Sequence, residues 1–321
     1  MAGFKKLALK KGKIIKSFQH LTGLIAAPFA PLNAEGGLKL DIVEHYAKFL
    51  HRNGVQGAFV CGTSGESMSL SVAERMAIAK RWVEVAPPGL RVIVHVGHNA
   101  LPDSRALAAH AQEIRAWAIA AIAPSFFKPA TVADLVNFCA EVAAAAPSLP
   151  FYYYHMPAMS GVDFAMVDFL ELAESKIPNL AGIKFTHENL MDYAFCLNAK
   201  GGRFNMLFGR DEILLAALAL GARGAVGSTY NFAAPLYLNL MKAFDDNDLP
   251  KARLLQQKAI TMISVLAHCG ANFISASKAV MQMLGVECGK SRSPIAQISA
   301  EQRRKLQNVL TKMGFFDFCA K

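Results

Sequence analysis

The sequence has few charged residues and no long apolar runs. Only 18% of its 321 residues are charged and 53% are hydrophobic, a balance that excludes a disordered chain and allows a sizeable buried core. The longest apolar stretches, residues 116–124 and 213–220, are much shorter than the ~18–20 residues that a membrane-spanning helix requires. We therefore expect a folded chain with no membrane partner.

The six cysteines are scattered along the chain and form no C-x-x-C motif. In a chain of this length, that spacing favours reduced and mostly buried thiols over a disulfide framework or a zinc ribbon, and it predicts a cytoplasmic location. His95 and His98 form an H-x-x-H pattern, but no third ligand accompanies them, so we interpret them as core or rim histidines. We expect no metal and no cofactor.

Positive charge is concentrated at one end of the chain. The net charge is +10, and six lysines in the first sixteen residues account for most of it. The remaining excess is too small for a nucleic-acid-binding stripe, so no nucleic acid partner is expected. We interpret residues 1–20 as a basic N-terminal arm, with an organelle address as the alternative; its role is open, and a secretory signal is not indicated.

Short apolar runs alternate with helix-period stretches from residue 22 onwards. Eight runs, bounded by Gly, Pro or Asn, predict strands at residues 24–27, 55–60, 92–96, 119–123, 151–154, 181–184, 206–208 and 225–226. Each strand–helix unit spans about 30 residues, as in a (β/α)₈ barrel. An open doubly wound sheet is the structural alternative, but no Gly-rich phosphate-binding turn follows the first strand.

The fold that we expect is α/β, a (β/α)₈ TIM barrel at residues 21–245 with a C-terminal three-helix appendage at 246–321. Helical patterns at residues 249–268, 273–284 and 299–313 make up the appendage, which contains no predicted strand. Helix start signals support the pattern: Ser71 and Glu74 have capping-box spacing, Thr131 and Asp134 approximate it, and Pro102 suits a first helical turn.

Functional residues of such a barrel lie at the carboxyl ends of its strands. Lys184 ends the sixth predicted strand between two apolar residues, and their desolvation would favour a neutral, nucleophilic amine able to form a Schiff base. The alternative is a lysine that reaches out to water. Tyr154 ends the neighbouring strand, where its phenol could transfer protons beside that amine or simply fill the top of the barrel.

Three polar loops follow other strands at the same end of the barrel. Residues 62–66, Gly-Thr-Ser-Gly-Glu, form a turn whose amides and hydroxyls could hold an anion, and residues 227–231 form a second polar loop. In both cases an ordinary strand-to-helix loop is the alternative. Asp211 and Glu212 open a helix, where they either favour the helix dipole or accept hydrogen bonds from a polyol.

Together these motifs resemble the N-acetylneuraminate lyase (sialic acid aldolase) branch of the dihydrodipicolinate synthase-like superfamily. The resemblance covers residues 21–313 and rests on five motifs in family order, at residues 62–66, 154–161, 182–186, 209–212 and 227–231. It implies the barrel with three C-terminal helices, a homotetramer, and reversible cleavage of N-acetylneuraminate to pyruvate and N-acetylmannosamine.

The resemblance also implies a role for each site residue. Lys184 would form the imine with the C2 keto carbon, and Tyr154 would assist proton transfer. Thr63 and Ser64 would hold the substrate carboxylate. The hydroxylated tail of the sugar would be bound by the remaining site residues, Thr186, Gly209, Asp211, Glu212 and Ser228.

Some positions depart from the family pattern. Met159 stands where the synthases carry an arginine for a second carboxylate, and a thioether cannot make that bidentate contact. Residues 125–127, Ser-Phe-Phe, replace a segment that supplies a tyrosine from a neighbouring subunit in the synthases. Ser64 replaces a threonine but keeps the hydroxyl.

Two alternative functions remain: another pyruvate aldolase acting on a 2-keto-3-deoxy sugar acid, and a catalytically silent barrel that binds sialic acid or pyruvate.

Overall fold

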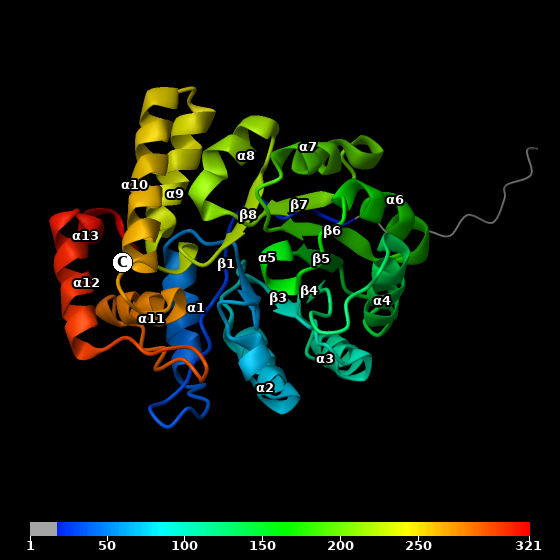
Figure 1. Ribbon diagram of the computed structural model, residues 1–321, viewed down its shortest axis with the longest axis horizontal. Helices are drawn as coiled ribbons and strands as arrows, with labels where there is room; N and C mark the ends of the chain where they lie inside the picture. Colours follow the sequence, from blue (N-terminus) through cyan, green and yellow to red (C-terminus); the bar gives the residue numbers. More distant parts are fainter. Residues whose placement is uncertain (1–17) are drawn as a thin grey trace, which may run out of the picture.

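Eight parallel strands close into a barrel in the computed structural model, which describes residues 18–321 (Figure 1). Each strand pairs with its neighbours in chain order, and β8 pairs with β1 to close the ring. The strands are β1 (Gly23–Ala26), β2 (Gly57–Val60), β3 (Arg91–His95), β4 (Ala118–Ile122), β5 (Phe151–His155), β6 (Leu180–Phe185), β7 (Asn205–Phe208) and β8 (Gly224–Gly227). The predicted (β/α)₈ barrel is confirmed, with strand ends within two residues of the predicted ones.

Helices follow the strands and surround the barrel. The helices up to the end of the barrel are α1 (Ile42–Arg52), α2 (Val72–Val85), α3 (Leu101–Glu113), α4 (Val132–Ala144), α5 (Pro157–Ser160), α6 (Met166–Lys176), α7 (Leu190–Asn198), α8 (Leu214–Leu220) and α9 (Tyr230–Asp245), with short 3₁₀ helices η1 (Ser67–Ser69), η2 (Ala199–Gly201) and η3 (Asp211–Ile213). Both predicted capping boxes form, since Ser71 and Thr131 each accept the backbone N–H three residues later. The local start signals thus fixed where α2 and α4 begin.

The C-terminal helices pack against one side of the barrel through α9. They are α10 (Leu249–Ala267), α11 (Phe273–Met283), α12 (Ala300–Lys312) and α13 (Phe315–Phe318). Figure 1 shows α10 beside α9, with α12 at the outer edge, on the side away from α3, α4 and α6. The division of the chain at residues 20 and 245 stays a prediction, because packing does not by itself show which parts fold independently.

The single-turn helix α13 was not predicted. Gly314 ends α12 with a left-handed backbone (φ 72°), and the chain then buries Phe315 against Phe232 at a ring-centroid distance of 6.3 Å. A four-residue helix is too short to show a 3.6-residue period, so only its packing reveals it.

Two apolar layers make up the core. One lies inside the ring of strands and includes Ile25, Phe59, Tyr152 and Tyr154; the other lies between the strands and the surrounding helices and includes Tyr153. Alternate residues of β5 therefore belong to different layers, as strand geometry requires. No helix in residues 18–321 is long and apolar enough to cross a membrane. The lysine-rich part of the predicted arm, residues 1–17, lies outside the described residues.

Candidate active site

A cavity of about 280 Å³ opens at the carboxyl ends of the strands. Its volume is near the lower end of the ~300–1,000 Å³ typical of small-molecule sites. All nine residues that the sequence predicted as site residues line it: Thr63, Ser64, Tyr154, Lys184, Thr186, Gly209, Asp211, Glu212 and Ser228. The fold thus brings together residues from the carboxyl ends of five strands and the loops that follow them, although their chemical roles stay predictions.

Lys184 is buried inside the barrel between two aromatic rings. Its Nζ lies 4.1 Å from the centroid of Phe59 and 3.8 Å from that of Tyr154. Burial lowers the pKa of Lys184 to about 7, while the charge of Asp211 acts in the opposite direction. At pH 7 roughly half of the amine is then neutral, whereas an exposed lysine is almost wholly protonated. The side chain of Lys184 therefore does not reach out to water, and that alternative is wrong.

A β-bulge in β6 sets the direction in which Lys184 points. Phe151 of β5 pairs with Leu180, but Tyr152 pairs with Gly182, which leaves Ala181 as an extra residue. Leu180 belongs to the outer apolar layer, so regular alternation would direct residue 184 outward as well. The extra residue reverses the phase of the strand and places Lys184 inside, directly opposite Tyr154 in the strand pairing.

Tyr154 presents its hydroxyl to the loop that follows β2. Its Oη lies 3.1 Å from Oγ1 of Thr63 and 2.9 Å from Sδ of Met156. Burial raises the pKa of Tyr154 to about 12, although the hydrogen bond to Thr63, the nearby hydroxyl of Thr186 and the charge of Arg210 oppose this shift. The phenol is therefore protonated near neutral pH and begins any reaction as a proton donor.

A buried ion pair holds the loop at residues 62–66 in place. Glu66 has a left-handed backbone (φ 53°), and its carboxylate lies 2.6 Å from Nζ of Lys278 in α11. The other carboxylate oxygen accepts the backbone N–H of Arg292 at 2.7 Å. Thr63 and Ser64 thus lie on a turn that the C-terminal helices hold in place.

Asp211 is the buried acid at the opposite side of the cavity. Its Oδ2 accepts both the backbone N–H and the hydroxyl of Thr229, at 3.1 and 2.5 Å. Burial, together with the charge of the neighbouring Glu212, raises the pKa of Asp211 to about 6, although the Thr229 hydrogen bonds oppose this shift. A Cβ at Gly227 would overlap this carboxylate, so the glycine is required for the close approach of β8.

Several lining residues were not found from the sequence. Met156 and Arg210 lie at the rim, and the apolar residues Ile263, Phe273 and Ile274 of α10 and α11 cover the cavity. Arg210 forms ion pairs with Glu188, which lies 22 positions earlier in the chain, and with Glu212, which lies two positions later. The apolar residues carry no chemical signature, because they face the cavity only through the docking of the C-terminal helices.

The two histidines of the H-x-x-H pattern, His95 and His98, lie in different environments. His95 is buried, and its Nδ1 lies 2.8 Å from the carbonyl oxygen of Cys61. Burial, together with the charge of Arg75, lowers the pKa of His95 well below its usual range. His98 lies at the rim, where its Nδ1 accepts the backbone N–H of Ala100 at 3.0 Å. This geometry agrees with a core histidine and a rim histidine.

Comparison with known proteins yields one family. The model of the Dihydrodipicolinate synthetase family matches residues 20–313. N-acetylneuraminate lyase A of Xenopus laevis is 40% identical over 297 residues, which cover 92% of this chain and 96% of that one. Among solved structures, N-acetylneuraminate lyase from Aliivibrio salmonicida is 42% identical with a TM-score of 0.90, covering 93% of this chain and 98% of that one.

A further solved structure is a catalytic lysine mutant of Ruminococcus gnavus sialic acid aldolase. It is 28% identical with a TM-score of 0.86, and the match covers 92% of this chain and 97% of that one. The barrel, the buried lysine beside a tyrosine, and these matches lead to one assignment. The chain belongs to the dihydrodipicolinate synthetase family and, within it, to the branch of the N-acetylneuraminate lyases.

Proposed function

We propose that this protein is a Schiff-base lyase that reversibly cleaves N-acetylneuraminate to pyruvate and N-acetylmannosamine. The observation that carries the proposal is the partly neutral amine of Lys184, which faces the Tyr154 ring at 3.8 Å inside a cavity lined by hydroxyls and carboxylates. Relatives named for this activity are about 40% identical over most of the chain, and one neighbour in the family has a catalytic lysine.

The reaction begins with the attack of neutral Lys184 on the C2 keto carbon of the open-chain sugar. The phenol of Tyr154 donates a proton to the departing oxygen, so that water leaves and a protonated imine forms. Thr63 and Ser64 hold the substrate carboxylate during this step. Since the Tyr154 hydroxyl already lies 3.1 Å from Thr63, the carboxylate and the reacting carbon are placed together.

Cleavage then uses the imine as an electron sink. The new positive charge beside Tyr154 lowers the pKa of the phenol, so its phenolate accepts the proton of the C4 hydroxyl. The C3–C4 bond breaks, its electrons form the enamine of pyruvate, and the aldehyde of N-acetylmannosamine leaves. Protonation of the enamine and hydrolysis of the imine release pyruvate and restore the lysine.

Specificity for a long polyol depends on the far side of the cavity. Thr186, Asp211, Glu212 and Ser228 offer acceptors and donors there, and Thr229 occupies only one oxygen of Asp211 with its two hydrogen bonds. Hydroxyl groups beyond C4 have partners in such a site, whereas a shorter sugar acid leaves buried polar groups unpaired. The polar far side of the cavity therefore favours N-acetylneuraminate over a 2-keto-3-deoxy sugar acid.

Reductive trapping tests the chemistry directly. Incubation with pyruvate and borohydride, followed by peptide mass mapping, should label Lys184 and leave the equally buried Lys278 unlabelled. A label elsewhere, or none, would refute the mechanism and favour a silent binding barrel. Comparison of kcat/KM for N-acetylneuraminate and 2-keto-3-deoxygluconate tests the substrate, and equal values would overturn the proposed preference for N-acetylneuraminate.

We also propose a homotetramer and a cytoplasmic location. Phe126 and Phe127 follow β4 with 77% and 85% of their surface exposed, an arrangement that favours burial against a second copy. The six cysteines form no disulfide within the described residues, as expected in a reducing compartment. Sedimentation of the full-length chain as a monomer would contradict the first proposal, and an organelle pattern of the fluorescently tagged chain would contradict the second.

A further inference from the structure

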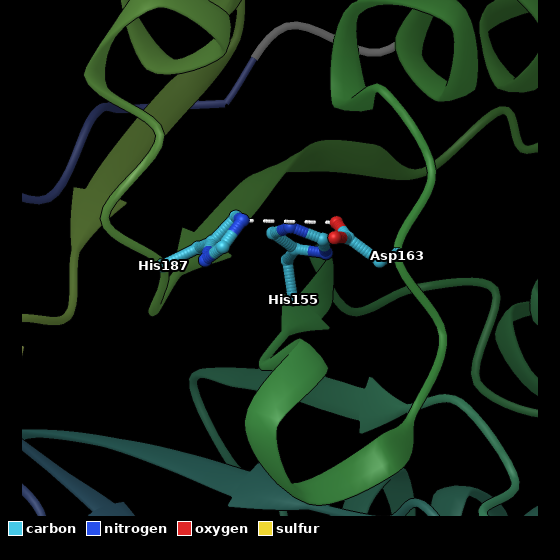
Figure 2. A group of neighbouring side chains, drawn as sticks. All are labelled: His155, Asp163 and His187. Carbon is cyan, nitrogen blue, oxygen red and sulfur yellow. Dashed lines mark ion pairs between the residues drawn. The ribbon is translucent and has the colours of Figure 1, made fainter.

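Three potential metal ligands meet on the outer side of the β5–β6 wall. His155 ends β5, His187 lies two residues beyond β6, and Asp163 lies in the connection between α5 and α6. One ligand atom of each lies within 4.8 Å of the others, and Nε2 of His187 is 3.7 Å from Oδ1 of Asp163 (Figure 2). No sequence motif joins these residues, since 32 positions separate the two histidines.

The cluster is separated from the cavity by the strands themselves. Tyr154 and Lys184 point into the barrel, so His155 and His187 project outward by strand alternation. None of the three ligand residues lines the active-site cavity. The strand ends are joined there by a hydrogen bond from the Thr186 N–H to the His155 carbonyl at 2.8 Å. A ligand at this position would therefore connect the strands that carry Tyr154 and Lys184.

His155 supplies the independent sign of a missing partner. The side chain is fully buried, yet neither ring nitrogen has a hydrogen-bond partner among residues 18–321. Two unsatisfied nitrogens are costly in a folded protein, and such groups call for an explanation. A buried imidazole with both nitrogens unpartnered, beside a second histidine and a carboxylate, has a nitrogen available to a cation.

Glu188 orients the second histidine. Its Oε2 lies 3.2 Å from Nδ1 of His187, a contact that favours the proton on Nδ1, while Nε2 lies 3.7 Å from Asp163. Histidine ligands of metals ordinarily donate their second N–H to a carboxylate in this way. Glu188 in turn pairs with Arg210, which lines the active-site cavity.

We propose that His155, His187 and Asp163 bind one Zn²⁺ ion. Two imidazoles and one carboxylate are a donor set that suits zinc, with water completing a tetrahedron. Metal–ligand distances of ~2.0–2.2 Å place neighbouring ligand atoms roughly 3.4 Å apart. The His187–Asp163 pair is close to that separation, and Asp163, 64% exposed, is free to turn toward the ion and gives it a path of entry.

His98 provides a matched comparison within the same chain. Its Nδ1 lies 3.4 Å from Asp103, so it forms a similar exposed histidine–carboxylate pair. However, that nitrogen accepts the backbone N–H of Ala100, and the described residues place no third ligand beside the pair. A His98→Ala variant therefore loses an exposed histidine without touching the zinc site.

The test is a titration of chelator-treated full-length protein with ZnCl₂ by calorimetry. We expect one equivalent to bind to the wild type and to His98→Ala. Asp163→Asn keeps the size and exposure of the side chain and so preserves the fold; it and His187→Ala should weaken binding by about 100-fold or more. Glu188→Gln should weaken it by roughly 10–100-fold, because the histidine loses its orienting carboxylate.

Two further measurements make the outcome decisive. X-ray absorption of the zinc-loaded protein should show only nitrogen and oxygen ligands, and zinc should raise the midpoint of thermal unfolding in the wild type but not in Asp163→Asn. No binding by the wild type, binding that is equal in all variants, or sulfur ligands would overturn the proposal. None of these readouts depends on lyase activity, so the zinc site and the proposed function fail independently.

Discussion

Lys184 and Lys278 are both buried, but only one of them has a counterion in contact. Lys278 in α11 lies 2.6 Å from the carboxylate of Glu66, with side-chain exposures of 2% and 0%. Lys184 at the barrel mouth instead contacts the faces of Phe59 and Tyr154. Burial lowers the pKa of both lysines, and for Lys278 the charge and hydrogen bond of Glu66 oppose this effect. Desolvation alone therefore does not create a nucleophile; the absence of an adjacent carboxylate is also needed.

The largest effect that distinguishes the two lysines should come from Lys184→Met. Turnover should fall by about 10⁵-fold or more, because no other group in the cavity forms the imine. The wild-type amine takes up a proton in the unfolded state (pKa 10.5) more readily than in the folded state (pKa about 7), so it disfavours folding below pH 10. The variant should thus gain up to about 4 kcal/mol in stability, measured by denaturant unfolding at pH 7.

A lower unfolding free energy for Lys184→Met would contradict this account, since it would mean that the lysine stabilises the fold. Retained turnover would remove Lys184 from the mechanism altogether.

Tyr154→Phe should give the next largest effect. The loss of the proton-transferring hydroxyl should lower kcat by roughly 10²–10⁴-fold, with a much smaller change in KM. Steady-state kinetics on N-acetylneuraminate measure both constants. Tyr152→Phe is the control, because Tyr152 also points into the barrel, but its hydroxyl donates to Asn205 of β7 and it does not line the cavity. A pure rise in KM would assign Tyr154 to binding only.

Lys278→Met should lower the unfolding free energy, whereas the main effect of Lys184→Met is the loss of turnover. Removing one member of a buried pair leaves the Glu66 carboxylate without its counterion, at a cost of about 3–5 kcal/mol in unfolding free energy. The double variant with Glu66→Gln should recover much of the loss, because the amide still accepts the Arg292 N–H without a buried charge. Destabilisation that persists in the double variant would show that packing, and not charge, is what Lys278 supplies.

The pH dependence should report the titration of Lys184. Because the neutral amine is the nucleophile, kcat/KM should fall about tenfold per pH unit below pH 7 and level off above it. Since the pKa of Tyr154 is near 12, the phenol should cause no second inflection between pH 6 and 10. A profile that is still rising tenfold per pH unit at pH 9 would show an ordinary lysine.

Phe59→Glu gives Lys184 the neighbour that Lys278 already has. A carboxylate beside the amine favours its charged form, so the inflection should move to higher pH, and each tenfold rise in proton affinity should lower activity at pH 7 about tenfold. Phe59→Gln has the same shape without the charge and should keep the inflection nearer to pH 7. Identical profiles for the two variants would show that an adjacent carboxylate does not control the pKa of Lys184.

The order of the fold was predictable because its signals are local. Apolar runs such as residues 92–96, capping residues such as Ser71 and a spacing of about 30 residues each report on a few neighbouring positions. The nine predicted site residues line one cavity for a related reason: they lie at or just beyond strand ends, and closure of a parallel barrel brings all such ends to one rim. Strand-end position indicated several of them, but Thr186 and Gly209 were predicted only from the family resemblance, and the roles of all nine stay predictions.

The remaining features depend on contacts between distant segments. The Glu66–Lys278 pair joins residues more than 200 positions apart, and the cavity is covered by Ile263 and Ile274, which resemble any other core residues in the sequence. The cluster of His155, Asp163 and His187 likewise has no recognisable spacing. Local patterns cannot encode such meetings, because they arise only when the ring of strands closes and the C-terminal helices dock.

The amino-acid sequence was enough to predict a lysine near the end of the sixth strand beside a tyrosine near the end of the fifth. The direction in which that lysine points depends on the folded structure, because the extra residue Ala181 reverses the strand alternation and its presence shows only in the pairing of β6 with β5. The same holds for its reactivity. Burial between Phe59 and Tyr154, and not the residue type, lowers the pKa of the Lys184 amine to about 7.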